Sequence, residues 1–191
     1  MIKIGIVGDI GSGKSYIAKQ FGFPVFNADN EVKKIYKKNR KCFKKLKRAF
    51  PKYIFSFPIK KKEISSIIFK NKNNVKKINK IIHPEVRLKM KKFLKKNKNE
   101  IAVVLDIPLL LEGGIHKRRD VLLFVQAKKK DINKKLKKRY NFNPKIIKKL
   151  KKLQLPLEIK KRKSDFIIKN NFRSISIKKN VKILKNKILN K

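Results

Sequence analysis

The sequence predicts an α/β fold in which a parallel β-sheet is flanked by helices. Short apolar runs of strand length alternate with longer Lys-rich segments whose apolar residues recur every three or four positions. A glycine-rich stretch follows the first apolar run, and an aspartate follows each of the next two. In a parallel sheet, residues that follow the strands in this way gather at one edge, where such folds bind their ligands.

The glycine-rich stretch 8–15 reads Gly-Asp-Ile-Gly-Ser-Gly-Lys-Ser and has the GxxxxGK[ST] spacing of a phosphate-binding loop. It joins the apolar run 2–7, which we expect to be a buried strand, to a helix that begins near Lys14. A chance glycine-rich turn is the alternative, but the strand before it and the helix after it favour the phosphate-binding interpretation.

The residue types of this loop suit the chemistry of a polyphosphate. Side chains at Gly8, Gly11 and Gly13 would keep the backbone N–H groups away from the phosphate oxygens. Lys14 is expected to reach the β and γ oxygens, and the Ser15 hydroxyl to complete the shell of a bound Mg2+. The loop therefore predicts binding of a nucleoside triphosphate together with Mg2+.

Composition indicates a soluble, cytoplasmic protein. With 191 residues, of which 41% are hydrophobic, the chain can form one domain with its own core. The single Cys42 cannot form an internal disulfide, which favours a reducing compartment. The longest apolar stretches have strand length, so we expect neither a transmembrane segment nor a membrane partner.

The formal net charge of +45, from 57 Lys and Arg against 12 Asp and Glu, would ordinarily indicate a nucleic-acid partner. Here the charge is mostly Lys, spread along the whole chain with an excess of Ile and Asn, as an A+T-rich coding sequence produces. A nucleic-acid reader would more often concentrate Arg on one element and interleave aromatic residues. We therefore expect no specific nucleic-acid partner, and keep nucleic-acid binding as an alternative.

The first half of the chain is expected to contain two strands and a helical insertion. A short helix after the loop ends at Gly22, and the run 24–26 makes the second strand. Asp29 follows that strand, on the same edge as the phosphate loop. From residue 30 to 98 the helical spacing is interrupted by prolines, and His83-Pro84 is expected to end one helix and begin the next.

The second half returns to the sheet. The run 101–105 is the clearest buried strand, and Asp106 follows it at the carboxyl edge. The other expected elements are a strand at 121–125, a helix at 128–139, a loop at 140–144, a helix to about 153, a strand at 165–168 and a terminal helix at 177–189.

Several motifs along the chain resemble those of the dephospho-CoA kinase family. They are the loop 8–15, Asn27-Ala28-Asp29, His83-Pro84, the D-x-P-L-L-x-E segment 106–112, the Q-x-P-L-E-x-K segment 154–160 and the D-x-x-I-x-N strand 165–170. The phosphate loop alone is shared by many enzymes, whereas segment 106–112 combined with Asp29 and segment 154–160 is specific to the family. The resemblance extends from one end of the chain to the other.

The resemblance implies a single P-loop kinase domain. Its core would be 1–29, 99–127 and 156–191, with a helical substrate-binding insertion at about 30–98 and a helical lid at about 128–155. The implied reaction transfers the γ-phosphoryl group of ATP to the 3'-hydroxyl of the ribose of dephospho-CoA, the last step of coenzyme A synthesis. We expect the enzyme to be a monomer.

The family resemblance also implies catalytic roles for Asp29, Lys14 and Arg139. A hydroxyl must lose its proton as it attacks, so Asp29 is the candidate base, with orientation of Mg2+ as a second role. The alternative for Asp29 is a cap on a helix that begins at Asn30. Arg139 would be the cation that the lid brings to the phosphates, and one more solvated charge is its alternative.

Substrate and nucleotide contacts follow from the same resemblance. His83 and Asp106, together with Pro108 and Leu109, would shape the dephospho-CoA pocket, although His83 could instead be a capping residue. The remaining nucleotide contacts would come from Ser12 and Tyr16 in the loop and from Asn170 near the adenine.

Three residues depart from the family pattern. Asp9 stands where the loop usually has glycine, Asn27 replaces the first aspartate of D-A-D, and Tyr16 replaces threonine. Asp9 brings a carboxylate close to a polyphosphate, which should weaken binding unless the side chain points outward. Tyr16 removes a hydroxyl that could touch the α-phosphate. Lys14 and Asp29 remain, so we expect an active enzyme.

Two other functions compete with this interpretation. Another small P-loop kinase, of the nucleoside monophosphate or shikimate type, would share the loop but give no reason for segment 106–112. A basic nucleic-acid-binding protein with a vestigial loop would bind RNA or DNA with an affinity that falls linearly in log salt.

Overall fold

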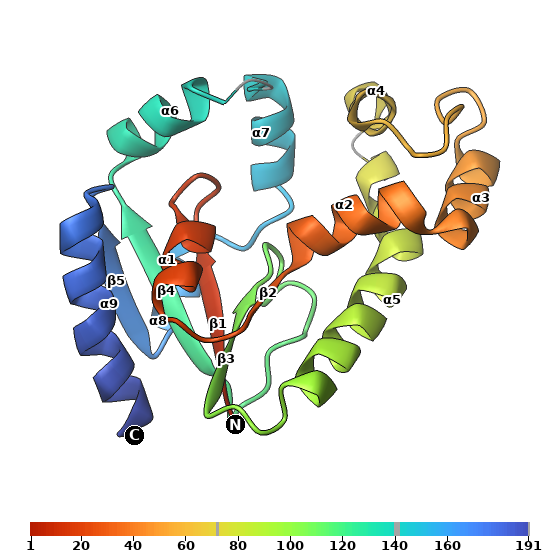
Figure 1. The fold of residues 1–191 in the computed structure, drawn as a ribbon. Helices are drawn as coiled ribbons and strands as arrows, with labels where there is room; N and C mark the ends of the chain where they lie inside the picture. Colours follow the sequence, from red (N-terminus) through yellow and green to blue (C-terminus); the bar gives the residue numbers. More distant parts are fainter. Residues whose placement is uncertain (72, 140–141, 191) are drawn as a thin grey trace. The chain divides into compact units, whose positions relative to one another are not determined.

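The computed structural model describes residues 1–71, 73–139 and 142–190 (Figure 1). The chain forms two compact units, which we call the core unit (Met1–Asn27 and Asn97–Lys191) and the helical unit (Ala28–Lys96). The first two residues of the loop expected at 140–144 lie outside the described residues. The helical unit spans Ala28–Lys96, and the substrate-binding role expected for residues 30–98 stays a prediction.

The core unit contains a five-stranded parallel sheet of order β2-β3-β1-β4-β5 (Figure 1). The strands are β1 (Ile2–Gly8), β2 (Val25–Asn27), β3 (Ala102–Asp106), β4 (Val121–Ala127) and β5 (Phe166–Asn170). The central strands β1, β3 and β4 consist of nearly continuous buried apolar residues, as expected where helices cover both faces of a sheet. The predicted α/β class is confirmed.

The register of the strands sets the carboxyl edge. In β1, Gly8 lies opposite Val125 of β4, and in β2, Asn27 lies opposite Asp106 of β3. Because every strand runs in the same direction, the loop after β1 and the ends of β2 and β3 lie at one edge of the sheet.

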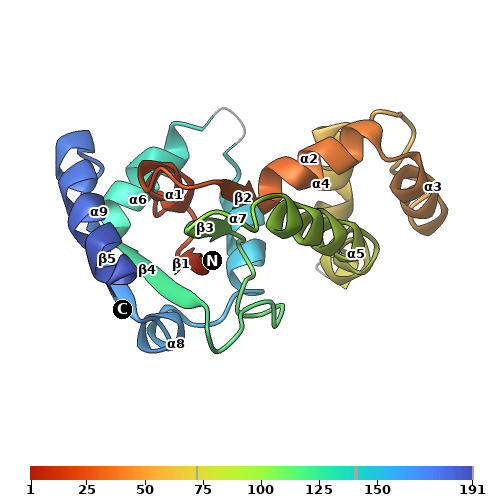
Figure 2. The same cartoon turned by 60° about the horizontal axis from the view of Figure 1, so that its bottom comes forward.

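Helices cover the two faces of the sheet in the core unit. The apolar residues of α1 (Lys14–Gln20) and α9 (Ser174–Leu189) pack with alternate strand residues in one buried cluster. The short helix α8 (Leu157–Arg162), which the sequence analysis did not anticipate, packs on β1 from the other face (Figure 2). After β4 come α6 (Lys129–Lys137) and α7 (Pro144–Lys151), and α7 buries none of its residues.

The helical unit contains α2 (Ala28–Lys38), α3 (Arg40–Ala49), α4 (Lys61–Lys70) and α5 (Asn73–Lys96). The prediction that His83-Pro84 separates two helices is wrong, because α5 runs through Pro84 without a break. Proline removes one backbone hydrogen bond there. The buried residues of α5 form a stripe on both sides of the proline, and their packing holds the helix together: Val75, Ile78, Ile82 and Val86.

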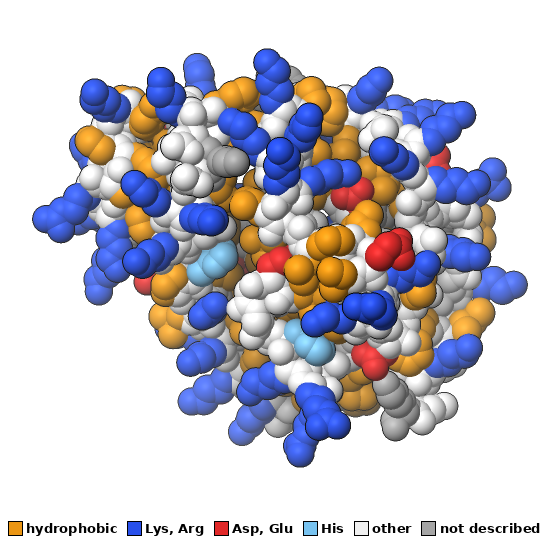
Figure 3. Space-filling view, turned by 180° about the vertical axis from the view of Figure 1, so that it is seen from behind, with side chains coloured by type: hydrophobic (Ala, Val, Ile, Leu, Met, Phe, Trp, Pro, Cys, Tyr) orange, Lys and Arg blue, Asp and Glu red, His pale blue; other side chains and the backbone are white. Residues whose placement is uncertain are grey.

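Figure 3 shows one face of the molecule, on which Lys and Arg side chains are dispersed among hydrophobic and polar ones instead of forming one patch. This dispersion agrees with the even spread of Lys along the sequence. Within the described part of the chain, none of the helices combines the length and the apolar character needed to span a membrane.

Candidate active site

The phosphate loop has a backbone that requires glycine before α1. Gly13 precedes the first residue of α1 with φ of 89°, in the left-handed region. A Cβ atom on Gly13 would lie 2.2 Å from Nδ2 of Asn170, so there is no room for a side chain. Packing within the protein therefore excludes a side chain here, in addition to the approach of a phosphate that the sequence analysis considered.

Asn170, at the end of β5, supports this loop. Its side chain is only 4% exposed, its Nδ2 donates to the carbonyl oxygen of Ser12 at 2.7 Å, and its Oδ1 accepts from the backbone N–H of Phe172 at 2.8 Å. We predicted a place near the adenine. In the structure, the Asn170 amide contacts the loop itself, which makes it a positioning group for the loop.

Replacing Asn170 with alanine is expected to lower the free energy of unfolding by about 1–3 kcal/mol, because a buried acceptor and a buried donor lose their partner. Urea denaturation measures this change. Lys169→Ala, at an exposed neighbouring residue of β5, is the control and should change stability by less than about 0.5 kcal/mol. Equal stability of the two variants would contradict the supporting role.

The polar groups inside the loop are arranged for an anion. Lys14 donates through Nζ to the carbonyl oxygens of Gly8 and Asp9, at 3.2 and 2.7 Å. Ser12 Oγ is buried and has no hydrogen-bond partner among the described residues, a costly situation that a phosphate oxygen or a water molecule would relieve. Ser15 is exposed in the first turn of α1, and its hydroxyl is a hard oxygen donor of the kind that Mg2+ takes beside phosphate oxygens.

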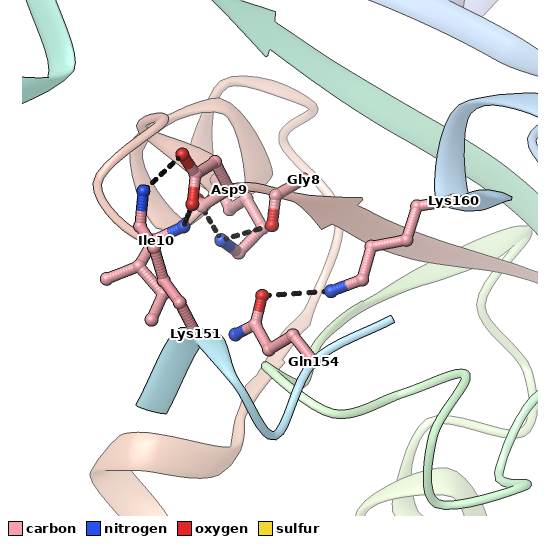
Figure 4. A network of polar contacts seen from close by, with 7 residues as sticks. Gly8, Asp9, Ile10, Lys151, Gln154 and Lys160 are labelled. Carbon is pink, nitrogen blue, oxygen red and sulfur yellow. Dashed lines mark hydrogen bonds and ion pairs between the residues drawn. The ribbon is translucent and has the colours of Figure 1, made fainter. Parts of the chain in front are cut away.

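Asp9 is held by two contacts (Figure 4). Its carboxylate accepts from the backbone N–H of Ile10 at 2.7 Å and forms an ion pair with Lys151 of α7 at 2.8 Å. The sequence analysis expected this carboxylate to weaken phosphate binding unless it pointed outward. In the structure, a cation from α7 compensates its charge.

Asp106 ends β3 at the carboxyl edge and is 2% exposed. The side chain of Asn27 on β2 donates through Nδ2 to Oδ2 of Asp106 at 2.5 Å. An aspartate at position 27 would bring two carboxylates into contact, and asparagine removes that repulsion. Pro108 and Leu109 follow in the turns after β3 and are partly buried.

Asp29 lies in the first turn of α2, two residues after the end of β2, and belongs to the helical unit. The alternative that it caps a helix starting at Asn30 is wrong, because α2 begins at Ala28. Asp29 is exposed to solvent.

His83 lies within α5 of the helical unit, beside a groove of about 400 Å³. The other lining residues are Lys76, Asn79, Lys80, Pro84 and Arg87. Burial, and then the charge of Arg87, hold the pKa of His83 below its ordinary value, which favours the neutral imidazole. The capping alternative for His83 is wrong because the helix continues past it, and the groove has the positive charge that an anionic group requires.

Two further predicted residues lie in the core unit. Tyr16 is bonded through its hydroxyl to Ser174 Oγ at 2.8 Å, which links α1 to the start of α9. Arg139 is exposed and follows the end of α6.

A buried ion pair was missed by the sequence analysis. Lys160 of α8 is 1% exposed, and its Nζ lies 2.9 Å from Oε1 of Glu112 and 2.9 Å from Oε1 of Gln154. The same Glu112 oxygen accepts from the backbone N–H of Leu155 at 2.8 Å. We call these four residues the Lys160 cluster. It joins segment 106–112 to segment 154–160, the two motifs that the sequence analysis found most specific.

Replacing Lys160 with methionine is expected to lower the free energy of unfolding by roughly 3 kcal/mol, because the largely buried Glu112 would lose its counter-ion. Urea denaturation tests this, with the exposed Lys163→Met as the matched control. A loss below about 1 kcal/mol, the value typical of surface pairs, would contradict the buried role.

Comparison with known proteins identifies the family of the chain. The sequence profile of the family described as dephospho-CoA kinase matches residues 2–175. A dephospho-CoA kinase of Fusobacterium nucleatum is 34% identical over 173 residues, which cover 88% of this chain and 89% of that protein. A dephospho-CoA kinase of a Wolbachia species from Brugia malayi is 32% identical over 170 residues, covering 86% of this chain and 87% of that protein.

Solved structures share the fold. A protein of Thermus thermophilus superposes with a TM-score of 0.78 at 26% identity, covering 99% of this chain and 97% of that one. A shikimate kinase of Bacteroides thetaiotaomicron, at 12% identity, gives a TM-score of 0.53 over 98% of both chains and shows the kinase fold alone. The family profile matches most of the chain, and relatives above 30% identity cover most of it. The chain therefore belongs to the dephospho-CoA kinase family of transferases.

Proposed function

We propose that this chain transfers the γ-phosphoryl group of ATP to the 3'-hydroxyl of the ribose of dephospho-CoA. The observation that carries the proposal is the phosphate loop. Gly13 precedes α1, whose first residues are Lys14 and Ser15, at the carboxyl edge of the sheet. The strand β2 ends at the same edge, and the chain reaches Asp29 two residues later. Membership of the family supports dephospho-CoA as the phosphoryl acceptor, and the phosphate loop supports ATP as the phosphoryl donor.

The loop residues bind and hold the triphosphate in this proposal. Lys14 exchanges its contacts with the carbonyl oxygens of Gly8 and Asp9 for the β and γ oxygens and stabilises the charge that develops there. Gly11 offers a backbone N–H group, with Ser12 Oγ as a further buried donor, while the Ser12 N–H donates to the Asp9 carbonyl oxygen at 3.1 Å. Ser15 would hold Mg2+, which when bound neutralises charge on the β and γ oxygens.

Asp29 accepts the proton of the attacking hydroxyl. The 3'-hydroxyl is neutral and must lose a proton as the new P–O bond forms, whereas a nucleoside monophosphate presents an oxygen that is already ionised. A carboxylate that is exposed at the start of α2 can receive this proton once the acceptor lies beside it.

The two units contribute separately to recognition of the acceptor. In the helical unit, the cationic groove at His83 suits the phosphate groups of dephospho-CoA. In the core unit, Asp106 with Pro108 and Leu109 supplies a fixed carboxylate and apolar surface after β3. We propose that segment 128–155 is the lid and that its Arg139 binds the phosphates when the lid closes and excludes water.

A coupled assay of ADP release across several acceptors tests the proposed function. Turnover with dephospho-CoA, and none with AMP, UMP or shikimate, is the expected result. Turnover with one of the other acceptors and none with dephospho-CoA would instead identify another small-molecule kinase.

The nucleic-acid alternative has its own test. We propose a cytoplasmic monomer with no specific nucleic-acid partner, so a 20-nucleotide RNA should bind weakly at physiological salt. Tight binding that is indifferent to ATP and Mg2+ would favour a nucleic-acid-binding protein with a vestigial loop.

A further inference from the structure

The chain that leaves α7 is attached to the rest of the core unit at two neighbouring places (Figure 4). Lys151, the last residue of α7, pairs with Asp9 of the phosphate loop at 2.8 Å. Three residues later, Gln154 contacts Lys160 at 2.9 Å, within the Lys160 cluster. The end of the proposed lid therefore touches both the loop and the interior of the core unit.

The two attachments differ in strength. The Lys160 side chain is 1% exposed and its partner Glu112 13%, so removing either would leave a desolvated charge. The Lys151 side chain is 40% exposed, and an ion pair with so exposed a member contributes little to stability. The Lys160 cluster is thus a fixed anchor, and the contact between Lys151 and Asp9 can be exchanged for another.

The charges around Asp9 indicate what that exchange would be. Two ammonium groups meet at this residue, Lys14 on its carbonyl oxygen and Lys151 on its carboxylate. Asp9 offers a single negative charge, whereas a polyphosphate in the loop offers several. A stronger anion placed there attracts both ammonium groups.

We propose that Lys151 is a further phosphate-binding residue, held within reach of the loop by the Lys160 cluster and paired with Asp9 until a nucleotide arrives. Nucleotide binding transfers the Lys151 ammonium from the Asp9 carboxylate to a phosphate oxygen. This inference rests on the nucleotide-binding half of the proposed function and is independent of the acceptor.

Calorimetric titration without any acceptor tests the inference. The ligands are a non-hydrolysable ATP analogue with Mg2+, inorganic tripolyphosphate, and adenosine. The variants carry Asp9→Asn, which keeps an acceptor for the Ile10 N–H but removes the charge, alone or combined with Lys151→Ala. Asp9→Asn combined with Lys152→Ala is the matched control, because it removes an exposed lysine one residue away.

In the Asp9→Asn background, position 9 carries no negative charge with which Lys151 could pair. We expect Lys151→Ala in this background to weaken binding of the ATP analogue and of tripolyphosphate about tenfold relative to the Lys152→Ala control, and to leave adenosine binding unchanged. Equal affinities would show that Lys151 only neutralises Asp9, and an equal loss with adenosine would indicate a structural defect; either result overturns the inference. Absence of turnover with dephospho-CoA would contradict the proposed function while leaving this measurement valid.

Discussion

Replacing Lys14 with alanine is expected to lower kcat/KM for phosphoryl transfer by about three orders of magnitude or more. In the proposed mechanism, the Lys14 ammonium group supplies the main positive charge of the loop at the β and γ phosphates. Without it, the charge that moves onto the bridging oxygen as the γ-phosphoryl group leaves is not stabilised. The fold should remain intact, because Lys14 contacts loop carbonyl oxygens and is not part of the apolar core.

The matched control for Lys14→Ala is Lys19→Ala, which removes an exposed lysine from the same helix. Its kcat/KM should stay within about twofold of the parent, since a charge exposed to solvent at the other end of α1 is screened by water and salt. Activity of Lys14→Ala close to that of the control, with both proteins folded by circular dichroism, would show that the loop does not carry out phosphoryl transfer.

Replacing Asp29 with asparagine is expected to lower kcat by roughly two to four orders of magnitude, with little change in the dissociation constant for ATP. Asparagine keeps the shape of the side chain and cannot accept the proton of the attacking hydroxyl. Single-turnover measurements with dephospho-CoA separate this chemical step from product release.

Glu31→Gln is the matched control for Asp29→Asn. Glu31 lies in the same first turn of α2, so the substitution removes one negative charge from the same helix end. The substitution also removes the ion pair between Glu31 and Lys34, and an ion pair of this kind contributes little to stability because the Lys34 side chain is exposed. If kcat of Asp29→Asn were no lower than that of Glu31→Gln, Asp29 would have no part in proton transfer.

The sheet and the phosphate loop could be predicted from the sequence because local signals specify them. The apolar run at Ile2–Gly8 leads directly into the loop, and α1 follows within a few residues, so spacing alone fixes their order. The strands at Ala102–Asp106 and Val121–Ala127 are nearly uniform apolar runs, as buried parallel strands require.

Tertiary packing decided the features that the sequence analysis missed. Pro84 is a local signal for a helix end, but the apolar stripe on both sides of it packs as one face, and α5 continues. The helix α8 spans only six residues, too few for its spacing to be diagnostic.

Charge pairs were the least predictable part of the site. Among 57 Lys and Arg residues, only its place in the family-like segment 154–160 distinguishes the buried Lys160 from its solvated neighbours. The partners of Lys151 and Lys160 lie far away in the sequence, at Asp9 and Glu112, so the pairs exist only once the sheet has brought these segments together. The scarcity of acidic residues gave a further hint, because each acid in a chain with only 12 Asp and Glu is surrounded by candidate partners.

Identification of the reaction product tests the central claim most directly. The purified protein is incubated with dephospho-CoA, Mg2+ and ATP labelled at the γ-phosphate, and the product is analysed by phosphorus NMR and mass spectrometry. We predict one added phosphate, carrying the label, on the 3'-oxygen of the ribose, with stoichiometric ADP. A label found in inorganic phosphate or on any other position of the acceptor would contradict the account.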